Sequence, residues 1–239
     1  MSQTISLNVN YNKYCDKDNN KKHSELFPNS IRMIIAGSSG CGKTNLMINF
    51  LLGGVLDLDD VIVYTTTSHQ KLYEFLRKYY DELKKLHSIK HHIVKFYTPE
   101  DNIMNPSELD PNKTHIIIFD DVMNESNQKV MTDYFTKGRH NNINVFYLCQ
   151  SLHQLKKHGI RQNANIFVLF RQDNKTLKYF YETEISCDMD FDEFEKFCND
   201  AWLEKHGYVV INLWEEPEFG RYMQNYRSVY TPQKYSKIF

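Results

Sequence analysis

Short apolar runs alternate along the chain with longer stretches whose apolar residues recur at helical spacing. The short runs are rich in β-branched and aromatic residues, which is typical of buried strands. They predict strands at 31–36, 61–66, 92–97, 115–119, 144–149, 166–170 and 208–213. The longer stretches predict helices at 44–52, 70–86, 127–137 and 191–206. Because strands and helices alternate, we expect an α/β fold in which a mostly parallel β-sheet is covered by helices on both faces.

The two ends of the chain lack this alternation. Residues 1–29 mix Asn, Lys, Asp and Tyr without periodicity, which favours a tail or an arm that contacts another subunit. Residues 216–239 are rich in Tyr and include Pro217, Gly220 and Pro232, so we expect a second tail there. The pattern therefore divides the 239 residues into an N-terminal segment (1–29), one α/β domain (30–215) and a C-terminal segment (216–239).

Composition narrows the class of protein. The chain is 41% hydrophobic with a formal net charge of −1, so it has enough apolar residues for a core and too little positive charge to coat nucleic acid. Any contact with DNA must therefore use a local patch. Its five cysteines are irregularly spaced without a C-x-x-C pair, which argues against zinc or a disulfide framework and favours a reducing, intracellular setting. No apolar run approaches the ~20 residues of a membrane span.

A glycine-rich turn joins the first predicted strand to the first predicted helix, and it fits the phosphate-loop (Walker A) pattern G-x-x-x-x-G-K-[ST]. Glycines let successive backbone N–H groups face phosphate oxygens, and the helix N-terminus adds positive potential. Lys43 would contact the β- and γ-phosphates, and the Thr44 hydroxyl would bind Mg²⁺. The predicted nucleotide-binding residues are Gly37, Ser38, Ser39, Gly40, Cys41, Gly42, Lys43 and Thr44.

Two carboxylates follow the apolar run 115–119, as in a Walker B motif. Asp120 would bind the magnesium ion, and Asp121 would polarise the attacking water. Hydrolytic motors commonly have Glu in the second place, so the shorter Asp121 must reach the water differently. The simpler alternative is that the pair begins a turn or caps a helix. Gln150 ends another predicted strand, where its amide could sense the γ-phosphate or the attacking water.

The nucleotide is expected to be ATP. The N-K-x-D motif of guanine recognition is missing, because Asn174-Lys175 lacks the following Asp, and there is no L-S-G-G-Q signature of a transporter cassette.

Four segments occur in an order and spacing that resemble one family: 37–44, 116–121, 135–140 and 147–151. They are similar to the viral genome-packaging ATPases of the FtsK/HerA superfamily, as in poxviruses, other large DNA viruses and virophages. The resemblance covers roughly residues 30–172. It implies a RecA-like P-loop NTPase fold and a homo-oligomeric ring that drives double-stranded DNA into a preformed capsid with ATP. The implied partners are DNA, further copies of the chain and a capsid or portal component, with the host cytoplasm (a viral factory) or the virion as location.

The resemblance also implies an arginine supplied to a neighbouring subunit's active site. Arg139 is the first candidate, because it lies in the matching Gly-Arg step, and Arg161 and Arg171 are competitors. The alternative for Arg139 is an ordinary surface charge at a helix end. DNA contact is less visible in the sequence. We expect it from the loop at 153–161, where Lys156 and Lys157 lie.

Two other functions stay open at this point. A nucleotide or nucleoside kinase would have a similar length, but it needs an acceptor pocket and an Arg-rich lid that the sequence does not indicate. A nucleotide-switched assembly factor would bind nucleotide without acting as a motor. Substitution of Lys43 by Ala and of Asp121 by Asn separates these cases, because a switch would tolerate the second change.

Overall fold

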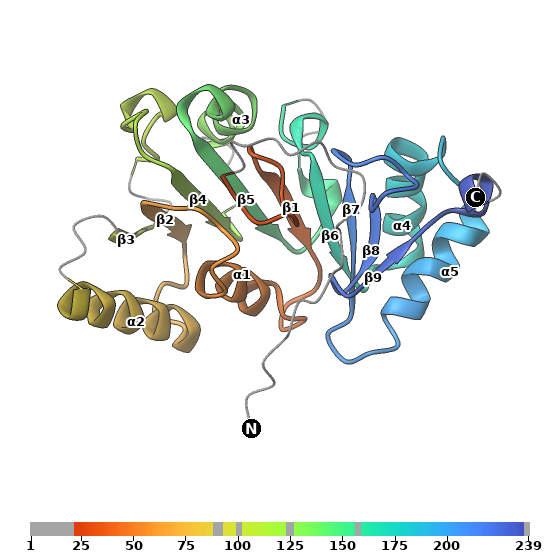
Figure 1. The fold of residues 1–239 in the computed structure, drawn as a ribbon, viewed down its shortest axis with the longest axis horizontal. Helices are drawn as coiled ribbons and strands as arrows, with labels where there is room; N and C mark the ends of the chain where they lie inside the picture. The colour runs from red at the N-terminus through yellow and green to blue at the C-terminus, as the bar shows by residue number, and fades with distance from the viewer. Residues whose placement is uncertain (1–21, 88–92, 99–101, 123–126, 156–158, 237–239) are drawn as a thin grey trace.

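The computed structural model describes residues 22–87, 93–98, 102–122, 127–155 and 159–236. Its centre is a nine-stranded sheet in the order β3-β2-β4-β5-β1-β6-β7-β8-β9 (Figure 1). The strands are β1 Arg32–Ala36, β2 Asp60–Thr65, β3 Ile93–Tyr97, β4 His115–Asp120, β5 Ile143–Cys149, β6 Ile166–Phe170, β7 Tyr208–Asn212, β8 Tyr222–Gln224 and β9 Ser228–Tyr230. The strands from β3 to β6 pair in parallel, and β7, β8 and β9 are added antiparallel. The expected mostly parallel α/β sheet is confirmed.

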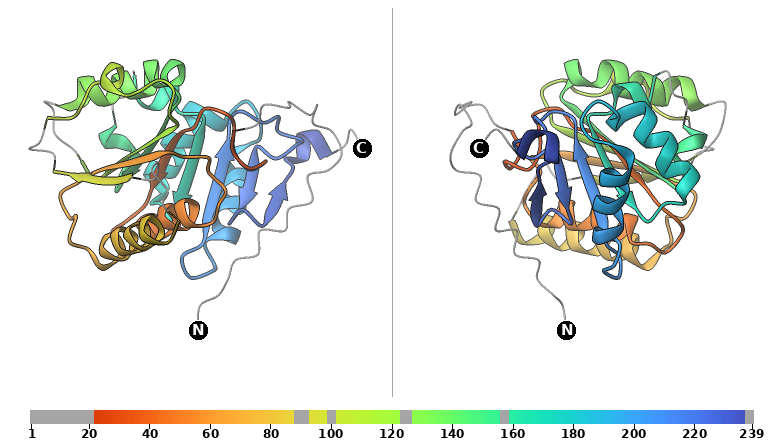
Figure 2. Two further views of the ribbon diagram at one scale, coloured as in Figure 1. Left: turned by 60° about the vertical axis from the view of Figure 1, so that its left-hand side comes forward. Right: turned by 90° about the vertical axis from the view of Figure 1, so that its right-hand side faces the viewer.

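Helices cover both faces of this sheet (Figures 1 and 2). They are α1 Lys43–Leu52, α2 Lys71–His87, α3 Gln128–Lys137, α4 Asn174–Phe180, α5 Phe191–Ala201 and α6 Gln233–Ser236. Short 3₁₀ turns lie at η1 Pro106–Glu108, η3 Gly138–Asn141, η4 Leu152–Gln154 and η5 Arg161–Asn163, and a π-helical turn, η6, spans Tyr181–Ile185. The predicted helix at 191–206 is shorter than expected, because α5 ends at Ala201.

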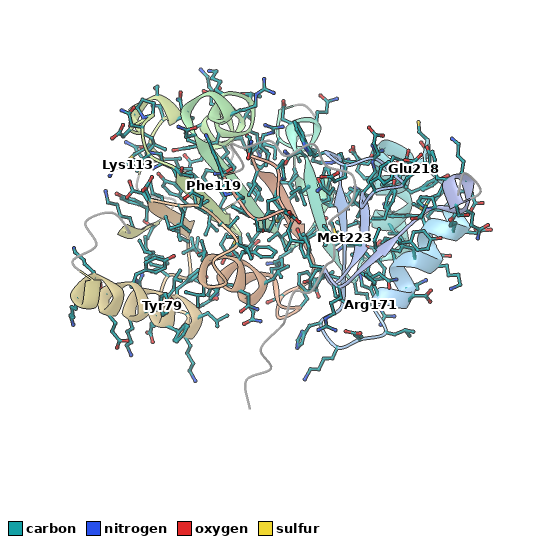
Figure 3. The ribbon with its side chains drawn as sticks, in the orientation of Figure 1. Tyr79, Lys113, Phe119, Arg171, Glu218 and Met223 are labelled. Carbon is teal, nitrogen blue, oxygen red and sulfur yellow. The ribbon has the colours of Figure 1, made fainter. Side chains whose placement is uncertain are left out.

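Neighbouring residues of each central strand enter two different hydrophobic cores. In β1, Ile34 and Ala36 pack in the core that α3, α4 and α5 cover, whereas Met33 and Ile35 pack in the core that α1 and α2 cover. Full burial of an Ile or Met side chain is worth about 1.5–3 kcal/mol. A continuous apolar strand is therefore stable only because both of its faces are covered. Figure 3 shows how densely side chains fill the space around Phe119 of β4, which is fully buried.

The C-terminal segment differs from the expected tail. Within 216–239, β8 and β9 extend the sheet, and Tyr222 and Tyr226 are buried. The division at 215/216 therefore does not mark the end of the folded domain. Strands of three residues are too short to give a periodic pattern, which is why the sequence did not indicate them.

The described part of the N-terminal segment, residues 22–29, also packs on the domain. The Phe27 ring lies 5.2 Å from that of Phe50 in α1 and 5.9 Å from that of Tyr226. The buried His23 side chain is hydrogen-bonded to Asn144 at the start of β5. The first and last parts of the described chain thus meet on one face of the sheet. Among the described helices, none is long and apolar enough to cross a membrane.

Candidate nucleotide-binding site

The glycine-rich loop lies between β1 and α1, at the carboxyl edge of the parallel strands. Gly40 and Gly42 have φ angles of 74° and 117°, in the left-handed region that favours glycine. A Cβ on Gly37 would lie 2.6 Å from the Cβ of Phe170, so only glycine fits there. The loop leads directly into the N-terminus of α1, a ten-residue helix without a side-chain cap, and such a helix end attracts anions. The predicted phosphate loop therefore has the required geometry.

Lys43 is held close to this loop. Its side chain is buried, and Nζ donates to the carbonyl oxygens of Gly37 and Ser38 at 2.6 and 3.1 Å. The ammonium group is thus placed over the loop, where a lysine meets β- and γ-phosphate oxygens in P-loop proteins. The Cys41 thiol takes no visible part, and burial raises its pKa above the ordinary value.

Asp120 and Thr44 come together beside a residue that sequence reasoning did not single out. Asp120 ends β4 and is only 6% exposed, and Tyr73 of α2 donates its hydroxyl to Oδ2 of Asp120. Burial raises the pKa of Asp120, while hydrogen bonds from Tyr73 and Thr44 and the charge of Lys43 oppose that rise. A buried carboxylate in this position favours a cation as its partner.

The residues fit a magnesium ion that arrives with a nucleotide. The Thr44 hydroxyl and the Asp120 carboxylate are the oxygen donors that Mg²⁺ prefers, and the remaining ligands of such ions are phosphate oxygens and waters. No group of three His, Cys, Asp or Glu residues that could hold a metal exists among the residues described by the structure.

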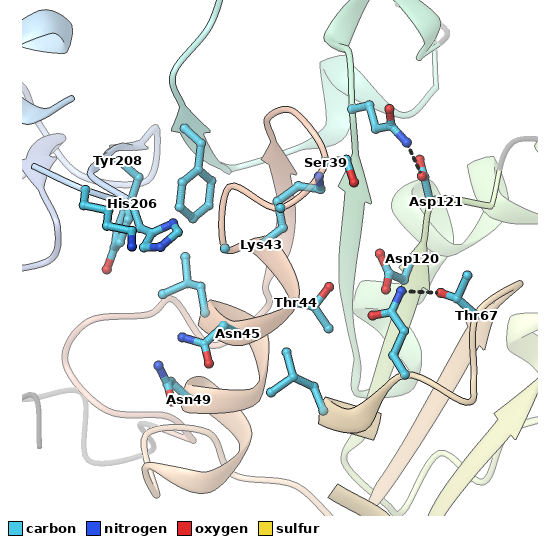
Figure 4. Close-up of a pocket in the computed structure, with 18 of the residues that line it drawn as sticks. Ser39, Lys43, Thr44, Asn45, Asn49, Thr67, Asp120, Asp121, His206 and Tyr208 are labelled. Carbon is cyan, nitrogen blue, oxygen red and sulfur yellow. Dashed lines mark hydrogen bonds between the residues drawn. The ribbon is translucent and has the colours of Figure 1, made fainter. Parts of the chain in front are cut away.

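Asp121 and Gln150 meet at the mouth of the site. The parallel register pairs Asp120 of β4 with Leu148 of β5, so the residues that follow the two strands lie close together. Gln150 Nε2 donates to Asp121 Oδ2 at 2.5 Å, and both side chains are exposed (Figure 4). Asp121 has a φ of 55°, which turns the backbone away from the strand direction. The predicted carboxylate and amide are thus brought together facing the phosphate end of the cleft.

These groups line one cleft of about 960 Å³. Beyond the predicted residues it is lined by Thr66, Thr67, Gln70, Tyr208, His206 and their neighbours. Gln70 Nε2 donates to Thr67 Oγ1 at 2.7 Å on the Asp120 side of the cleft (Figure 4). No motif marked these residues. Thr66, Thr67 and Gln70 come from the connection after β2, His206 lies just before β7, and Tyr208 is the first residue of β7.

The three candidate arginines lie in different environments. Arg139 is exposed on η3, at the amino end of β5, which is the edge of the sheet opposite the phosphate loop. Arg161 is 1% exposed, and its guanidinium donates to Tyr179 Oη at 2.6 Å and to Thr183 Oγ1 at 3.1 Å. Arg171 is exposed directly after β6, at the same edge as the phosphate loop. Arg161 is therefore fixed within its own chain, whereas Arg139 and Arg171 are open to solvent.

Arg139 cannot reach the phosphate loop of its own chain from the opposite edge, so a catalytic role for it requires a second subunit. Its charge lies near Arg32, whose pKa is lowered by burial and by Arg139. Lys156 and Lys157 lie outside the described residues.

The phosphate loop, the carboxylates after β4 and the amide after β5, on a parallel sheet, define a P-loop ATPase. Within this class the chain matches the family described as Poxvirus A32 protein over residues 19–183, well over half of its length. The chain belongs to that family. No curated protein sequence matches it significantly.

Solved structures of similar fold include packaging enzymes of two Sulfolobus turreted icosahedral viruses. The DNA-packaging ATPase B204 of Sulfolobus turreted icosahedral virus aligns with a TM-score of 0.54 and 15% identity, over 86% of this chain and 98% of that chain. The genome packaging NTPase B204 of Sulfolobus turreted icosahedral virus 2, in complex with AMP, aligns with a TM-score of 0.54 and 12% identity, over 86% and 99%. The complex of that enzyme with ATP-gammaS aligns with a TM-score of 0.50 and 12% identity, over 78% of this chain and 94% of that chain. At these identities the likeness establishes the P-loop NTPase fold.

Proposed function

We propose that this protein is an ATP-hydrolysing motor that moves double-stranded DNA into a viral capsid as a homo-oligomeric ring. The observation that carries the proposal is the arrangement at the cleft, where a phosphate loop faces Asp120, Asp121 and Gln150. These side chains are suited to orient a water molecule as the acceptor of the γ-phosphoryl group, and not a second substrate. Membership of the A32 family and the fold shared with the DNA-packaging ATPase B204 support the DNA-directed part of the proposal.

Each residue has a distinct part in hydrolysis. The backbone N–H groups of 37–44 and the Lys43 ammonium group hold the triphosphate and stabilise the charge that develops on the γ-phosphoryl group. Thr44 and Asp120 would hold Mg²⁺, which neutralises charge on the β- and γ-phosphate oxygens when bound. Asp121 accepts a hydrogen bond from the attacking water and orients it for in-line attack.

Gln150 links this chemistry to movement. Its amide is hydrogen-bonded to Asp121, and Gln150 begins the segment 150–154, which includes η4. Loss of the γ-phosphate would change the partners of Asp121 and hence of Gln150. A shift of this segment is the route by which hydrolysis would act on bound DNA.

A neighbouring subunit would complete the site. Arg139 faces solvent at the edge opposite its own phosphate loop, so stacking of subunits in a ring would place it against the next subunit's cleft. An arginine supplied in this way is worth about 10³–10⁵ in turnover where it has been measured in other phosphohydrolases.

We further propose that the protein acts in the host cytoplasm, at the site of virion assembly.

The proposal is tested by steady-state ATP hydrolysis with and without linear double-stranded DNA, together with sizing of the protein with and without ATP. We expect DNA to raise turnover several-fold and ATP to shift the protein to a ring-sized species. Arg139→Ala should assemble normally yet lose most of the stimulated turnover, with Lys137→Ala on the neighbouring exposed position as the control. A monomer whose hydrolysis ignores DNA would reject the motor function.

A further inference from the structure

The cleft continues beyond the phosphate loop, away from the hydrolytic residues. There its lining includes Asn45 and Asn49 on α1, the turn 204–208, which follows α5 and ends on Tyr208, the first residue of β7, and two residues after β8, Asn225 and Arg227. Figure 4 shows His206 and Tyr208 on the side of Lys43 opposite Asp120 and Asp121. We call this region the outer end of the cleft.

The turn 204–208 is held in contact with the phosphate loop. His206 Nδ1 is hydrogen-bonded to the Cys41 carbonyl oxygen at 2.9 Å, and a Cβ on Gly42 would lie 3.8 Å from the His206 Cβ. The Tyr208 ring lies 5.3 Å from Phe170, whose Cβ is the contact that excludes a side chain from Gly37. A nucleotide seated in the loop is therefore bordered by this turn without any rearrangement of the chain.

Polar groups join the turn to the end of β8. Glu204 Oε2 accepts from Arg227 Nη1 at 3.1 Å and from Asn225 Nδ2 at 3.3 Å, and Asn225 Oδ1 accepts from the Tyr208 backbone N–H at 2.8 Å. The Glu204 and Arg227 side chains are 58% and 54% exposed, so their ion pair adds little to stability and remains open to a ligand. The wall thus combines aromatic surfaces with hydrogen-bonding groups that face the cleft.

The direction of a bound triphosphate follows from the phosphate end. The γ-phosphate must lie toward Asp121 and Gln150, so the α-phosphate lies toward the first turn of α1, next to Asn45. Whatever is attached to the α-phosphate then enters the outer end. A sugar needs hydrogen-bond partners for its hydroxyl groups, and a flat base needs an apolar or aromatic surface.

We propose that the outer end is a nucleoside subsite, in which the ribose and base lie between Asn45 and Asn49 on one side and the turn 204–208 on the other. His206 and Tyr208 supply the flat surfaces, and Asn45, Asn49 and Glu204 supply hydrogen bonds to the sugar and to the edge of the base. The subsite rests on the proposed nucleotide function. Three of its residues, Glu204, His206 and Tyr208, lie beyond the part of the chain that matches the A32 family, 19–183.

The test compares the affinities of Mg–ATP and Mg–tripolyphosphate by calorimetry. Tripolyphosphate fills the phosphate end and leaves the outer end empty, so the wild type should bind ATP at least about 10-fold more tightly, the equivalent of about 1.4 kcal/mol. His206→Asn should lose most of that advantage while binding tripolyphosphate as well as the wild type does. Asn is chosen because it tolerates the left-handed backbone at this position, where φ is 64°. Leu203→Ala, directly before this turn and 85% exposed, is the matched control.

Glu204→Gln is a second variant, which keeps the shape of the side chain and removes its charge. It should also lower the affinity for ATP and leave the affinity for tripolyphosphate unchanged. Equal affinity of the wild type for the two ligands would overturn the subsite. So would an unchanged ATP affinity in both variants, or a parallel loss of ATP and tripolyphosphate binding, which would mean that the turn only supports the phosphate loop. Thermal unfolding of each variant checks its folding. Loss of DNA-stimulated hydrolysis with intact ATP selectivity would reject the motor and leave the subsite standing.

Discussion

The two ends of the cleft are assembled in different ways. The phosphate end is formed by short segments at the carboxyl edge of adjacent parallel strands, each readable as a motif. The outer end is formed by a contact between Cys41 and His206, which are 165 positions apart, and by antiparallel strands added at the side of the sheet. The residues that contact phosphate are therefore specified by short local motifs, whereas the surfaces around the rest of the ligand depend on the tertiary fold.

The largest effect should come from Lys43→Ala. It removes the charge over the phosphate loop, and we expect ATP turnover to fall by about 10²-fold or more, the scale of losing one group that stabilises the transition state. Steady-state phosphate release measures it, with Lys178→Ala, an exposed lysine of α4, as the control. Retained turnover in Lys43→Ala would break the assignment of the phosphate end.

Asp121→Asn comes next and separates chemistry from binding. Loss of the group that orients water should lower kcat by about 10²-fold or more with little change in ATP affinity, since general-base groups contribute about 10²–10⁴. Rapid-mixing kinetics give kcat, and nucleotide-binding measurements on the same sample give the affinity for ATP. A variant with weakened ATP binding and normal kcat would place Asp121 outside the hydrolytic step.

Gln150→Ala should act through Asp121. The single substitution should lower kcat by about 10-fold. In an Asp121→Asn background it should lower kcat by less, because two residues joined by a hydrogen bond do not contribute independently. A double-mutant cycle on kcat measures this coupling. Fully additive effects would mean that Gln150 works without Asp121.

Tyr73→Phe tests the residue that connects α2 to the phosphate end. Asp120 would lose one hydrogen bond, so we expect a higher Mg²⁺ concentration for half-maximal ATP binding and a decrease in kcat of about 10-fold, in line with the 1.4 kcal/mol scale of a charged hydrogen bond. Titration of Mg²⁺ into protein and fluorescent nucleotide reads the first effect without relying on activity. Tyr80→Phe, on the same buried side of α2, is the control. An unchanged Mg²⁺ requirement would reduce Tyr73 to a packing residue.

The smallest effect is on stability. Burial raises the pKa of Asp120, so its ionised form is disfavoured in the folded protein without ligand. Asp120→Asn should therefore raise Tm by a few degrees, about 2–4 °C for each kcal/mol in a chain of this length, although it abolishes hydrolysis.

The sign of the pH dependence follows from the same shift. Below the ordinary carboxyl pKa of 3.8, Asp120 is protonated in both the folded and unfolded states, so its ionisation does not lower the free energy of unfolding. As the pH rises through the raised pKa of the folded state, the wild type loses stability relative to the variant. The difference in Tm should thus widen as the pH rises above 3.8 and become constant above the raised pKa of the folded state. A constant difference would show that the gain has another origin.

Much of the fold could be read from the sequence, because a strand buried on both faces needs an unbroken apolar run and the P-loop needs its glycines and Lys43. Asp120 and Gln150 were indicated because each ends such a run. Tyr73 was not, since its position on the apolar stripe of α2 predicts burial and says nothing of the group its hydroxyl reaches. His206 gave no signal either, because its contact with Cys41 depends on how β7 joins the sheet. The environment of Arg161 likewise required the packing of η6 against η5.

If the proposed function is correct, hydrolysis at the phosphate end moves the protein along DNA. The most direct measurement is displacement of a third strand from linear duplex DNA, which reports travel along the duplex independently of phosphate release. We expect displacement by the wild type with ATP and Mg²⁺, and none with a non-hydrolysable analogue or with Lys43→Ala. Brisk, DNA-stimulated ATP hydrolysis without any strand displacement would contradict it.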